Sequence, residues 1–444
     1  MCAEKGILLR KTFWLVIIGL LLLSFEISQG REIQNHNLVS ERDSKPLSVV
    51  LMIGDGMGFQ HVQLARWIEK GVNGTLNMEK LPIHLEVSTQ SANSPVTDSA
   101  AAATAIATGS KTNNGMLSYL ENGQTLKTIL EIANERNLST GLITTTEIFH
   151  ATPAAFYSHV RSRSNTSEIV NQLSNQSSID LFLGGGSSAF SSVTLMKMEQ
   201  EGYTYVSNRT QLAAVNTGKV LGLFSPNSIS YEQNRDPDVT PSLSEMTNKS
   251  LELLSRDENG FFLLVEGGKI DWGAHVNNKF DTALETIEFD HAVDVATTFI
   301  ESHPNHEILL LVTADHETGG FSIEGNTLND SLPSVTRTYT QNKALRLARV
   351  ANVSVTWSTT GHTGQVVPLY GFGTVLSHLN DMNIDNTAIF GIMKSHLFST
   401  ALTTPTTTPS TTRPILWSRF GVLLPFFSLV ILSIFGKKRR QRID

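Results

Sequence analysis

Four apolar runs in the middle of the chain have the length and composition of buried β-strands. Each run gives way to glycine or to polar side chains that can bind metal ions. The four runs are Leu47 to Ile53, Leu142 to Thr146, Phe261 to Glu266 and Ile308 to Asp315. In open α/β sheets, ligands bind beyond the carboxyl ends of the strands. The pattern therefore predicts that these polar residues meet at one edge of a sheet.

Helical patterns lie between the strand-like runs. The segment from Ser99 to Ala107 is rich in alanine, Thr125 to Arg136 is amphipathic, and Thr282 to Ile300 is longer. This alternation predicts an α/β fold with a mostly parallel central sheet and helices on both faces.

The N-terminal 30 residues have the pattern of a signal peptide. Three basic residues precede an apolar run from Phe13 to Phe25, and Ser28, Gln29 and Gly30 follow it. Charge before a short apolar run, with small residues after it, predicts export and a signal peptide over residues 1–30. An uncleaved signal anchor remains open.

The C-terminal residues have the pattern of a membrane anchor. Residues 401–414 are rich in Thr and Pro and predict an extended stalk, residues 415–436 are apolar, and residues 437–444 are mostly basic. Basic residues after the apolar run favour a transmembrane helix over a lipid-anchor signal. We therefore expect a single-pass membrane protein, anchored at the cell surface by one C-terminal helix, with residues 31–400 as an extracellular catalytic domain.

Composition narrows the chemistry of any ligand. Residues 31–400 contain 24 Lys and Arg against 38 Asp and Glu, a formal charge of −14, which disfavours nucleic-acid binding. Cys2 is the only cysteine, so His, Asp and Glu must provide any metal ligands. Sequons are consistent with an exported glycoprotein. They begin at Asn73, Asn137, Asn165, Asn175, Asn208, Asn248, Asn329 and Asn352.

A hydroxyl group stands at the expected start of the alanine-rich helix, in Thr97-Asp98-Ser99-Ala100. A serine in this position is ordinarily an N-cap. A helix N-terminus also favours an anion and leaves backbone N–H groups free to bind it, so the same geometry suits a phosphoryl group beside Ser99. The G-x-S-x-G motif is absent from the sequence, which argues against a Ser/His/Asp esterase.

Carboxylates and histidines recur after the later strands. Asp271 and His275 are four residues apart, so on a helical turn they share one face and could bind one cation or form a simple ion pair. Asp315 and His316 follow a very apolar strand, and His362 lies between glycines. A single loop histidine is usually only a surface residue, but together these residues indicate a metal site.

Zinc chemistry explains this choice of residue types. Hydrolysis of a phosphate monoester requires neutralisation of a nearly dianionic group, activation of a nucleophile and stabilisation of the leaving oxygen. Two metal ions a few ångströms apart can do all three, and His with Asp but no Cys is a normal catalytic zinc set.

At this point the sequence closely resembles the alkaline phosphatase family. The resemblance rests on six motifs that occur in the family's order between Leu47 and Leu397. They are Asp55-Gly56-Met57-Gly58, Thr97 to Ala100, His150-Ala151-Thr152-Pro153, Glu266 to His275, Thr313-Ala314-Asp315-His316 and Gly361-His362-Thr363-Gly364.

The resemblance implies two zinc ions and one magnesium ion per subunit, with Ser99 becoming phosphorylated during the reaction. The implied ligands are Asp271, His275 and His362 for the first zinc; Asp55, Asp315, His316 and the Ser99 oxygen for the second; and Asp55, Thr152 and Glu266, with His150 beside them, for magnesium.

Three further positions bear on phosphate recognition. Arg163 matches the arginine that grips the phosphate oxygens in the family, although Arg161 is close by. Trp272 stands at a substrate-binding position where other members have Lys or His, and His150 stands where some have Asp. We therefore expect weaker inhibition by phosphate than in a lysine-bearing relative.

The resemblance also implies partners. We expect small-molecule phosphate monoesters as substrates and a homodimer as the assembly. A phosphodiesterase, sulfatase or phosphomutase would share the fold and several ligands, but Ser99 together with Arg163 favours monoesters. A catalytically silent surface protein is a further alternative, which the complete set of expected ligands disfavours.

Overall fold

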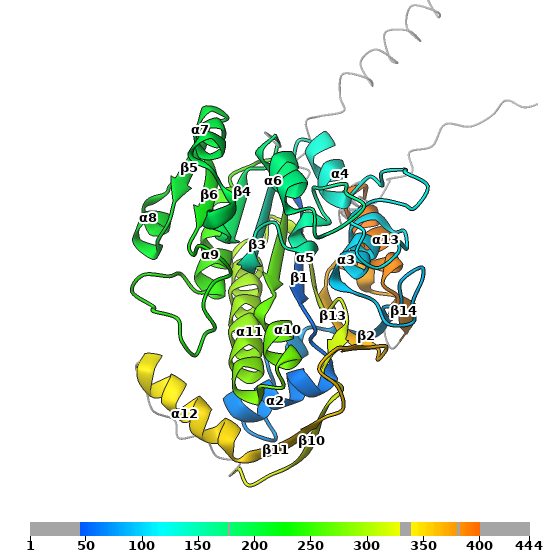
Figure 1. Ribbon diagram of the computed structural model, residues 1–444, viewed down its shortest axis with the longest axis vertical. Coiled ribbons are helices and arrows are strands. Elements are labelled where there is room, and N and C mark those ends of the chain that lie inside the picture. Colours follow the sequence, from blue (N-terminus) through cyan, green and yellow to red (C-terminus); the bar gives the residue numbers. More distant parts are fainter. Residues whose placement is uncertain (1–44, 176–177, 329–338, 380–381, 400–444) are drawn as a thin grey trace, which may run out of the picture. The chain divides into compact units, whose positions relative to one another are not determined.

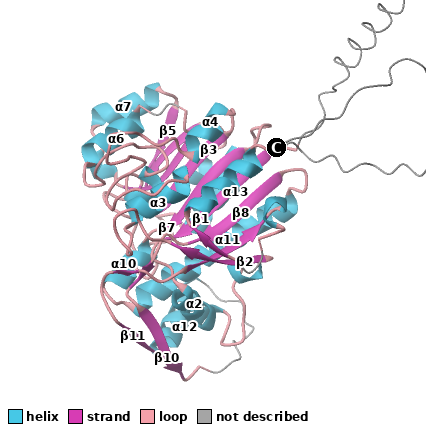
Figure 2. Ribbon diagram, turned by 90° about the vertical axis from the view of Figure 1, so that its right-hand side faces the viewer, coloured by secondary structure: helices cyan, strands magenta, loops and turns pink. Residues whose placement is uncertain are grey.

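The computed structural model describes residues 45–175, 178–328, 339–379 and 382–399. All four predicted strands are present and they lie side by side at the centre of one sheet (Figures 1 and 2). In spatial order they are β8 (Glu307–Thr313), β1 (Leu47–Gly54), β7 (Phe261–Gly267) and β3 (Ser139–Glu147). Each neighbouring pair is parallel, so their carboxyl ends meet at one edge.

The sheet as a whole is mixed, a correction to the expected parallel arrangement that concerns one strand, since the other neighbouring strands of the described sheet are parallel. Strand β13 (Val367–Phe372) runs antiparallel to both β8 and β2 (Ile83–Ser88). Residues 362–363 pair with residues 317–318 just beyond β8, so the chain is already at the carboxyl edge when it re-enters the sheet. With only Gly364 to Val366 as a connection, it has no room for a crossover helix and must run back.

Eight further strands complete the sheet or form small pairs beside it. Three extend it past β3, and one lies outside β2; two short pairs lie apart from the main sheet. The bounds are β4 (Leu181–Gly185), β6 (Lys219–Leu223), β5 (Tyr203–Val206), β14 (Asn383–Asp385), then the pairs β10 (Phe321–Asn326) with β11 (Val353–Trp357) and β9 (Glu317–Thr318) with β12 (His362–Thr363).

Helices cover both faces of the sheet (Figures 1 and 2). Helices α9 (Leu243–Leu254) and α11 (Lys279–Ser302) pack on one face, and α3 (Ser99–Thr108), α4 (Ile129–Glu135) and α13 (Thr387–Leu397) lie on the other. The central strands are therefore buried on both sides, which explains their continuous apolar runs. Helix α4 begins later than its amphipathic pattern suggests, because Thr128 and Glu131 form a capping box there.

The remaining helices are shorter or lie at the periphery. They are α2 (Phe59–Glu69), α5 (Ala151–Ala154), α6 (Thr166–Ser174), α7 (Ser192–Gln200), α8 (Arg209–Ala214), α10 (Lys269–His275), α12 (Tyr339–Ala351) and the 3₁₀ turns η1 (Met78–Lys80), η2 (Ser187–Ala189) and η3 (Thr374–Leu376).

The expected membrane-anchored fold requires a correction. Across the described ranges, no helix is long and apolar enough to cross a bilayer. The longest of these helices, α11, has 24 residues but carries acidic side chains along its length. The transmembrane helix is therefore withdrawn from the fold, and the single-pass cell-surface location is withdrawn with it. The segments assigned to a signal peptide (1–30), a stalk (401–414), a membrane span (415–436) and a basic tail (437–444) lie outside the described residues.

Candidate active site

Ser99 is the first residue of α3, and its neighbour Asp98 is the N-cap. Asp98 Oδ1 accepts hydrogen bonds from the backbone N–H groups of Ala101 (3.0 Å) and Gly115 (3.1 Å). The possible role of Ser99 as a cap is therefore filled by Asp98. Ser99 is only 2% exposed, and its hydroxyl lies 3.2 Å from His316 Nε2. The helix thus presents a buried hydroxyl at its electropositive end.

Around His316, electron-rich atoms converge on one point. Its Nε2 lies 3.4 Å from Asp55 Oδ1 and 3.2 Å from Asp315 Oδ2. The Thr318 hydroxyl donates to Asp271 Oδ1 (2.5 Å), so at its 3.2 Å contact with His316 Nδ1 the imidazole must be the donor. Nε2 then carries a lone pair that faces two carboxylates. A cation at this point would turn mutual repulsion into coordination.

A second convergence joins the end of α10 to β12. His275 Nδ1 donates to the Thr360 carbonyl (2.6 Å), and His362 Nδ1 donates to the Thr97 carbonyl (2.9 Å). Their Nε2 atoms are 3.1 Å apart, and they lie 3.2 Å and 3.6 Å from oxygens of Asp271. Backbone carbonyls on Nδ1 leave Nε2 free as the ligand atom, which is the usual arrangement of zinc-bound histidines.

A third group combines Asp55, His150 and Glu266, whose ligand atoms lie within 4.8 Å of one another. Asp55 carries two buried oxygens without hydrogen-bond partners, and Glu266 Oε1, Thr152 Oγ1 and His150 Nδ1 are also buried and unpartnered in the part of the chain that the structure describes. Oxygen atoms that have no hydrogen-bond partner and lie close together suit a hard cation such as magnesium.

The acid–base properties of these residues point the same way. Burial and the neighbouring carboxylate of Asp315 raise the pKa of Asp55 well above its usual value. Burial also raises the pKa of Asp315 to about 6 and that of Glu266 to about 7. Burial lowers the pKa of His316 well below 6.5, which keeps the imidazole neutral. Buried carboxylates crowded in this way need a positive charge among them, so the residues fit metal ions.

Gly56 allows two of these groups to approach each other. Its φ is +73°, and a Cβ atom there would lie 2.8 Å from Thr318 Oγ1 and 3.0 Å from the Asp271 Cα atom. Only glycine meets both requirements. The loop after β1 can therefore lie directly against the residues that follow β7 and β8.

Arg163 is held in the site, whereas Arg161 is exposed. Arg163 Nη1 donates to Asp98 Oδ2 (3.1 Å), and its Nη2 donates to His150 Nε2 (3.2 Å). Of the two arginines, Arg163 is therefore the one that lies next to the other predicted site residues. Trp272 lies edge-on to the His150 ring, with ring centroids 5.9 Å apart, so it borders the same side of the site.

The structure brings every predicted site residue to the carboxyl edge of the central strands, and it adds residues that the motifs did not single out. Asp98 anchors Arg163, Thr318 links Asp271 to His316, and Thr144 and Thr146 both donate hydrogen bonds to Glu266 Oε2. The Thr144–Thr146 run at the end of a predicted strand was the available signal for the last two. Thr318 gave none, since its role depends on packing.

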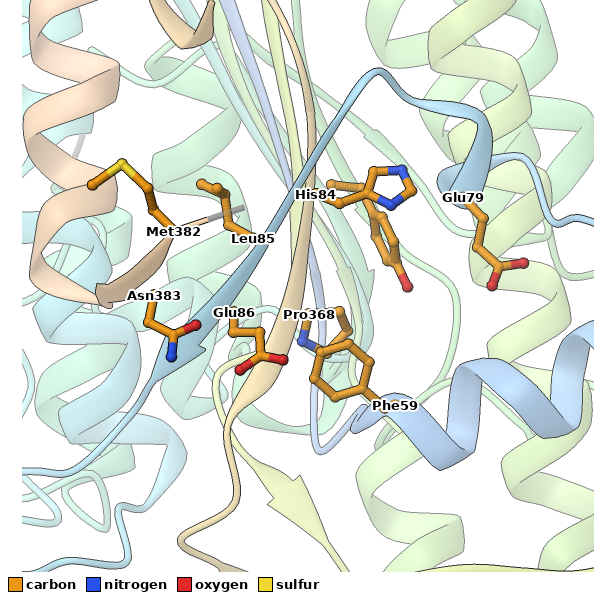
Figure 3. A pocket seen from close by; sticks show the side chains of 9 residues that line it. Phe59, Glu79, His84, Leu85, Glu86, Pro368, Met382 and Asn383 are labelled. Carbon is orange, nitrogen blue, oxygen red and sulfur yellow. The ribbon is translucent and has the colours of Figure 1, made fainter. Parts of the chain in front are cut away.

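A separate surface pocket of about 390 Å³ lies over β2 and β13 (Figure 3). Phe59, His84 and Glu86 line it, together with Pro368 and Met382. It contains none of the predicted ligands, so the candidate active site lies elsewhere, at the strand ends.

Comparison with known proteins identifies the family. Residues 47–346 match the family model described as alkaline phosphatase. Alkaline phosphatase 4 of Bacillus subtilis (strain 168) is 32% identical over 453 residues, with 87% of this chain and 97% of that protein aligned. The chain belongs to the alkaline phosphatase family. Alkaline phosphatase of Escherichia coli (strain K12) is likewise 32% identical, over 83% of this chain and 90% of that one.

Solved alkaline phosphatases share the fold. The cold-active alkaline phosphatase of Shewanella sp. superposes with a TM-score of 0.70 at 32% identity, covering 80% of this chain and all of that one. A histidine-to-aspartate variant of the alkaline phosphatase from the Antarctic bacterium TAB5, with magnesium bound in its M3 site, gives 0.66 at 29% identity, covering 80% and 98%. The protein is therefore a metal-dependent phosphatase that hydrolyses phosphate monoesters.

Proposed function

We propose that this phosphatase acts through a phosphoserine intermediate on Ser99. The observation that carries the proposal is the convergence around His316, where the Ser99 hydroxyl and two buried carboxylates face one unprotonated ring nitrogen. A hydroxyl buried among such groups is well placed to ionise beside a bound cation, which would stabilise the resulting alkoxide.

The proposed metal content is two zinc ions and one magnesium ion per subunit. The first zinc would be held by Asp271, His275 and His362, the second by Asp55, Asp315, His316 and Ser99, and magnesium by Asp55, Thr152 and Glu266 with His150 adjacent. When bound, these ions would supply positive charge to the phosphoryl group and lower the pKa of coordinated hydroxyls.

The chain's own groups perform the positioning. The oxygen of Ser99 attacks phosphorus and the alcohol leaves, so one P–O bond forms as another breaks; water then cleaves the Ser99 phosphoester and releases inorganic phosphate. Arg163 offers two N–H groups toward the non-bridging oxygens, and Asp98 holds the guanidinium in register with the helix that carries Ser99. Trp272 borders this site without adding charge.

The scope of the proposal follows from where recognition lies. All the charged groups of the proposed site act on the phosphate group of the substrate. We therefore propose that the substrates are a broad range of small-molecule monoesters, with no role for nucleic acid. We also propose that the catalytic domain spans residues 31–400 and that the enzyme is a homodimer, on the resemblance to the family alone.

The test is a trapping experiment on the full-length protein. Zinc- and magnesium-loaded enzyme is incubated with p-nitrophenyl phosphate, quenched in acid and analysed by peptide mass spectrometry. We expect phosphate on Ser99, loss of turnover in Ser99→Ala, and normal turnover in Ser110→Ala, which alters a serine just beyond the other end of the same helix. Turnover that survives in Ser99→Ala would overturn the proposal, and activity restricted to a diester or sulfate ester would assign a different reaction.

A further inference from the structure

A buried lysine lies directly behind the tryptophan that borders the phosphate site. Lys269 opens α10 and is only 4% exposed. Its Nζ atom is 3.8 Å from the centroid of the Tyr231 ring and 4.3 Å from that of the Trp272 ring, and it donates a hydrogen bond to Ser228 Oγ (3.1 Å). A cation between two aromatic rings, shielded from water, is strongly held, since desolvation strengthens cation–π attraction.

The contacts continue from Trp272 to the residue that is proposed to grip phosphate. The Trp272 ring meets His150 edge-on at 5.9 Å, and His150 Nε2 accepts a hydrogen bond from Arg163 Nη2 at 3.2 Å. The ammonium group of Lys269 is therefore connected to the guanidinium of Arg163 through two packed rings. Each contact is directional, so a shift of the tryptophan ring would move the surface against which His150 and Arg163 rest.

The side chain and the backbone of Lys269 are both held in place. Lys269 also begins α10 through its backbone, which donates to Thr145 Oγ1 (3.2 Å), so its position is fixed at both ends of the residue.

We propose that Lys269 is a positioning residue for phosphate recognition. Its contact with the Trp272 ring fixes the position of that ring, against which His150 packs, and His150 in turn contacts Arg163. Lys269 thereby sets the enzyme's affinity for phosphate without touching the substrate. This inference rests on the proposed role of Arg163, but not on the identity of the nucleophile.

The experiment measures binding of inorganic phosphate by calorimetry to full-length, metal-loaded enzyme, alongside kcat and KM for p-nitrophenyl phosphate. Lys269→Met keeps the length of the side chain and removes its charge, whereas Lys269→Arg keeps the cation. Lys219→Met is the matched control, because Lys219 also lies over an aromatic ring, that of Tyr203 at 5.5 Å, on strands β6 and β5 away from the site.

We expect Lys269→Met to weaken phosphate binding and to raise KM by about fivefold, with kcat much less affected, and we expect Lys269→Arg to restore both. Zinc and magnesium content should equal that of the parent. The effect should also depend on the ring: in a Trp272→Ala background, the further change Lys269→Met should alter phosphate binding little.

Three outcomes would overturn the inference. Phosphate binding in Lys269→Met could equal that of the parent, the Met and Arg variants could be equally impaired, or the effects of the Lys269 and Trp272 changes could simply add. Because phosphate binding is measured without turnover, these results stand even if Ser99 proves not to be the nucleophile.

Discussion

A histidine remote from the proposed metal ligands joins three helices, and its replacement should lower stability near neutral pH but no longer do so by pH 10. His291 of α11 contacts Glu288 Oε2 through Nδ1 (3.1 Å) and Glu69 Oε1 of α2 through Nε2 (3.3 Å). Arg346 of α12 donates twice to the same Glu69 carboxylate, at 2.6 Å and 2.8 Å. The perturbation is His291→Gln, which removes the titratable group and leaves a polar side chain.

The magnitude follows from the pKa of His291. Burial acts to lower it, but hydrogen bonds to Glu288 and Glu69 outweigh burial and raise the pKa from 6.5 to about 9. At about 1.4 kcal/mol for each unit, the shift corresponds to about 3 kcal/mol of stability. Because the folded-state pKa is raised, this stability is fully present below about pH 6.5 and is lost as pH rises through about 9. Against the effect of burial, the pKa values of Glu69 and Glu288 are lowered by the same hydrogen bonds to His291, so they add no further term to the free energy of unfolding.

Urea unfolding of the parent and His291→Gln between pH 6 and pH 10, at fixed free zinc and magnesium, provides the assay. Only the difference between the two proteins at each pH is interpreted, since metal binding itself changes with pH. We expect the parent to be more stable by about 3 kcal/mol at pH 6 and the two to converge by pH 10. His303→Gln is the control, since the His303 ring stacks on Phe299. A difference that stays constant or grows with pH would refute the reasoning.

Three further substitutions test the site itself. Trp272→Lys should strengthen inhibition by inorganic phosphate, because it adds a cation beside the phosphate site; an unchanged inhibition constant in steady-state kinetics would contradict this. Gly56→Ala should lower zinc content, measured by atomic absorption after dialysis, because the new Cβ atom would lie 3.0 Å from the Asp271 Cα atom at a φ of +73°; normal zinc content would show that the loop can relax. Asp98→Ala should cost about 1 kcal/mol in thermal unfolding through loss of the N-cap and should weaken phosphate binding by releasing Arg163, so an unaltered phosphate affinity would remove Asp98 from the recognition machinery.

Much of the fold could be predicted because its central strands are buried on both faces. Continuous apolar runs such as Leu47–Gly54 and Phe261–Gly267 are signals of that burial, and the ligands follow each strand directly. The direction of β13 could not be read in this way, since Val367–Phe372 is equally apolar whichever way it runs. Its direction depends on the pairing of β9 with β12, a contact between residues far apart in sequence.

The residues of the candidate site also fall into two groups: those that local sequence places together and those that only tertiary packing places together. Asp271 and His275 share a helical turn, so spacing alone predicts that they lie together. The contacts of Thr318 with Asp271, and of Lys269 with Tyr231, join segments that only the folded chain brings together. The cap of α3 illustrates a local failure: both Asp98 and Ser99 are good N-cap residues, and the choice between them is made by Gly115 and Arg163, which also bind Asp98.

The pairing of β9 with β12 has a consequence for how the enzyme is made. His362 completes the group of Asp271 and His275, yet it leaves the ribosome 87 residues after His275. At about 5–20 residues per second, that interval lasts several seconds, during which the cluster of Asp55, His150 and Glu266 is already whole. Translation thus imposes an order on the proposed ligand groups: the residues of the group suited to magnesium are synthesised first, and the proposed first zinc site is completed only near the end of synthesis. A ribosome stalled before residue 362 would carry a chain with every ligand of the other two proposed sites but without the last ligand of the first zinc site.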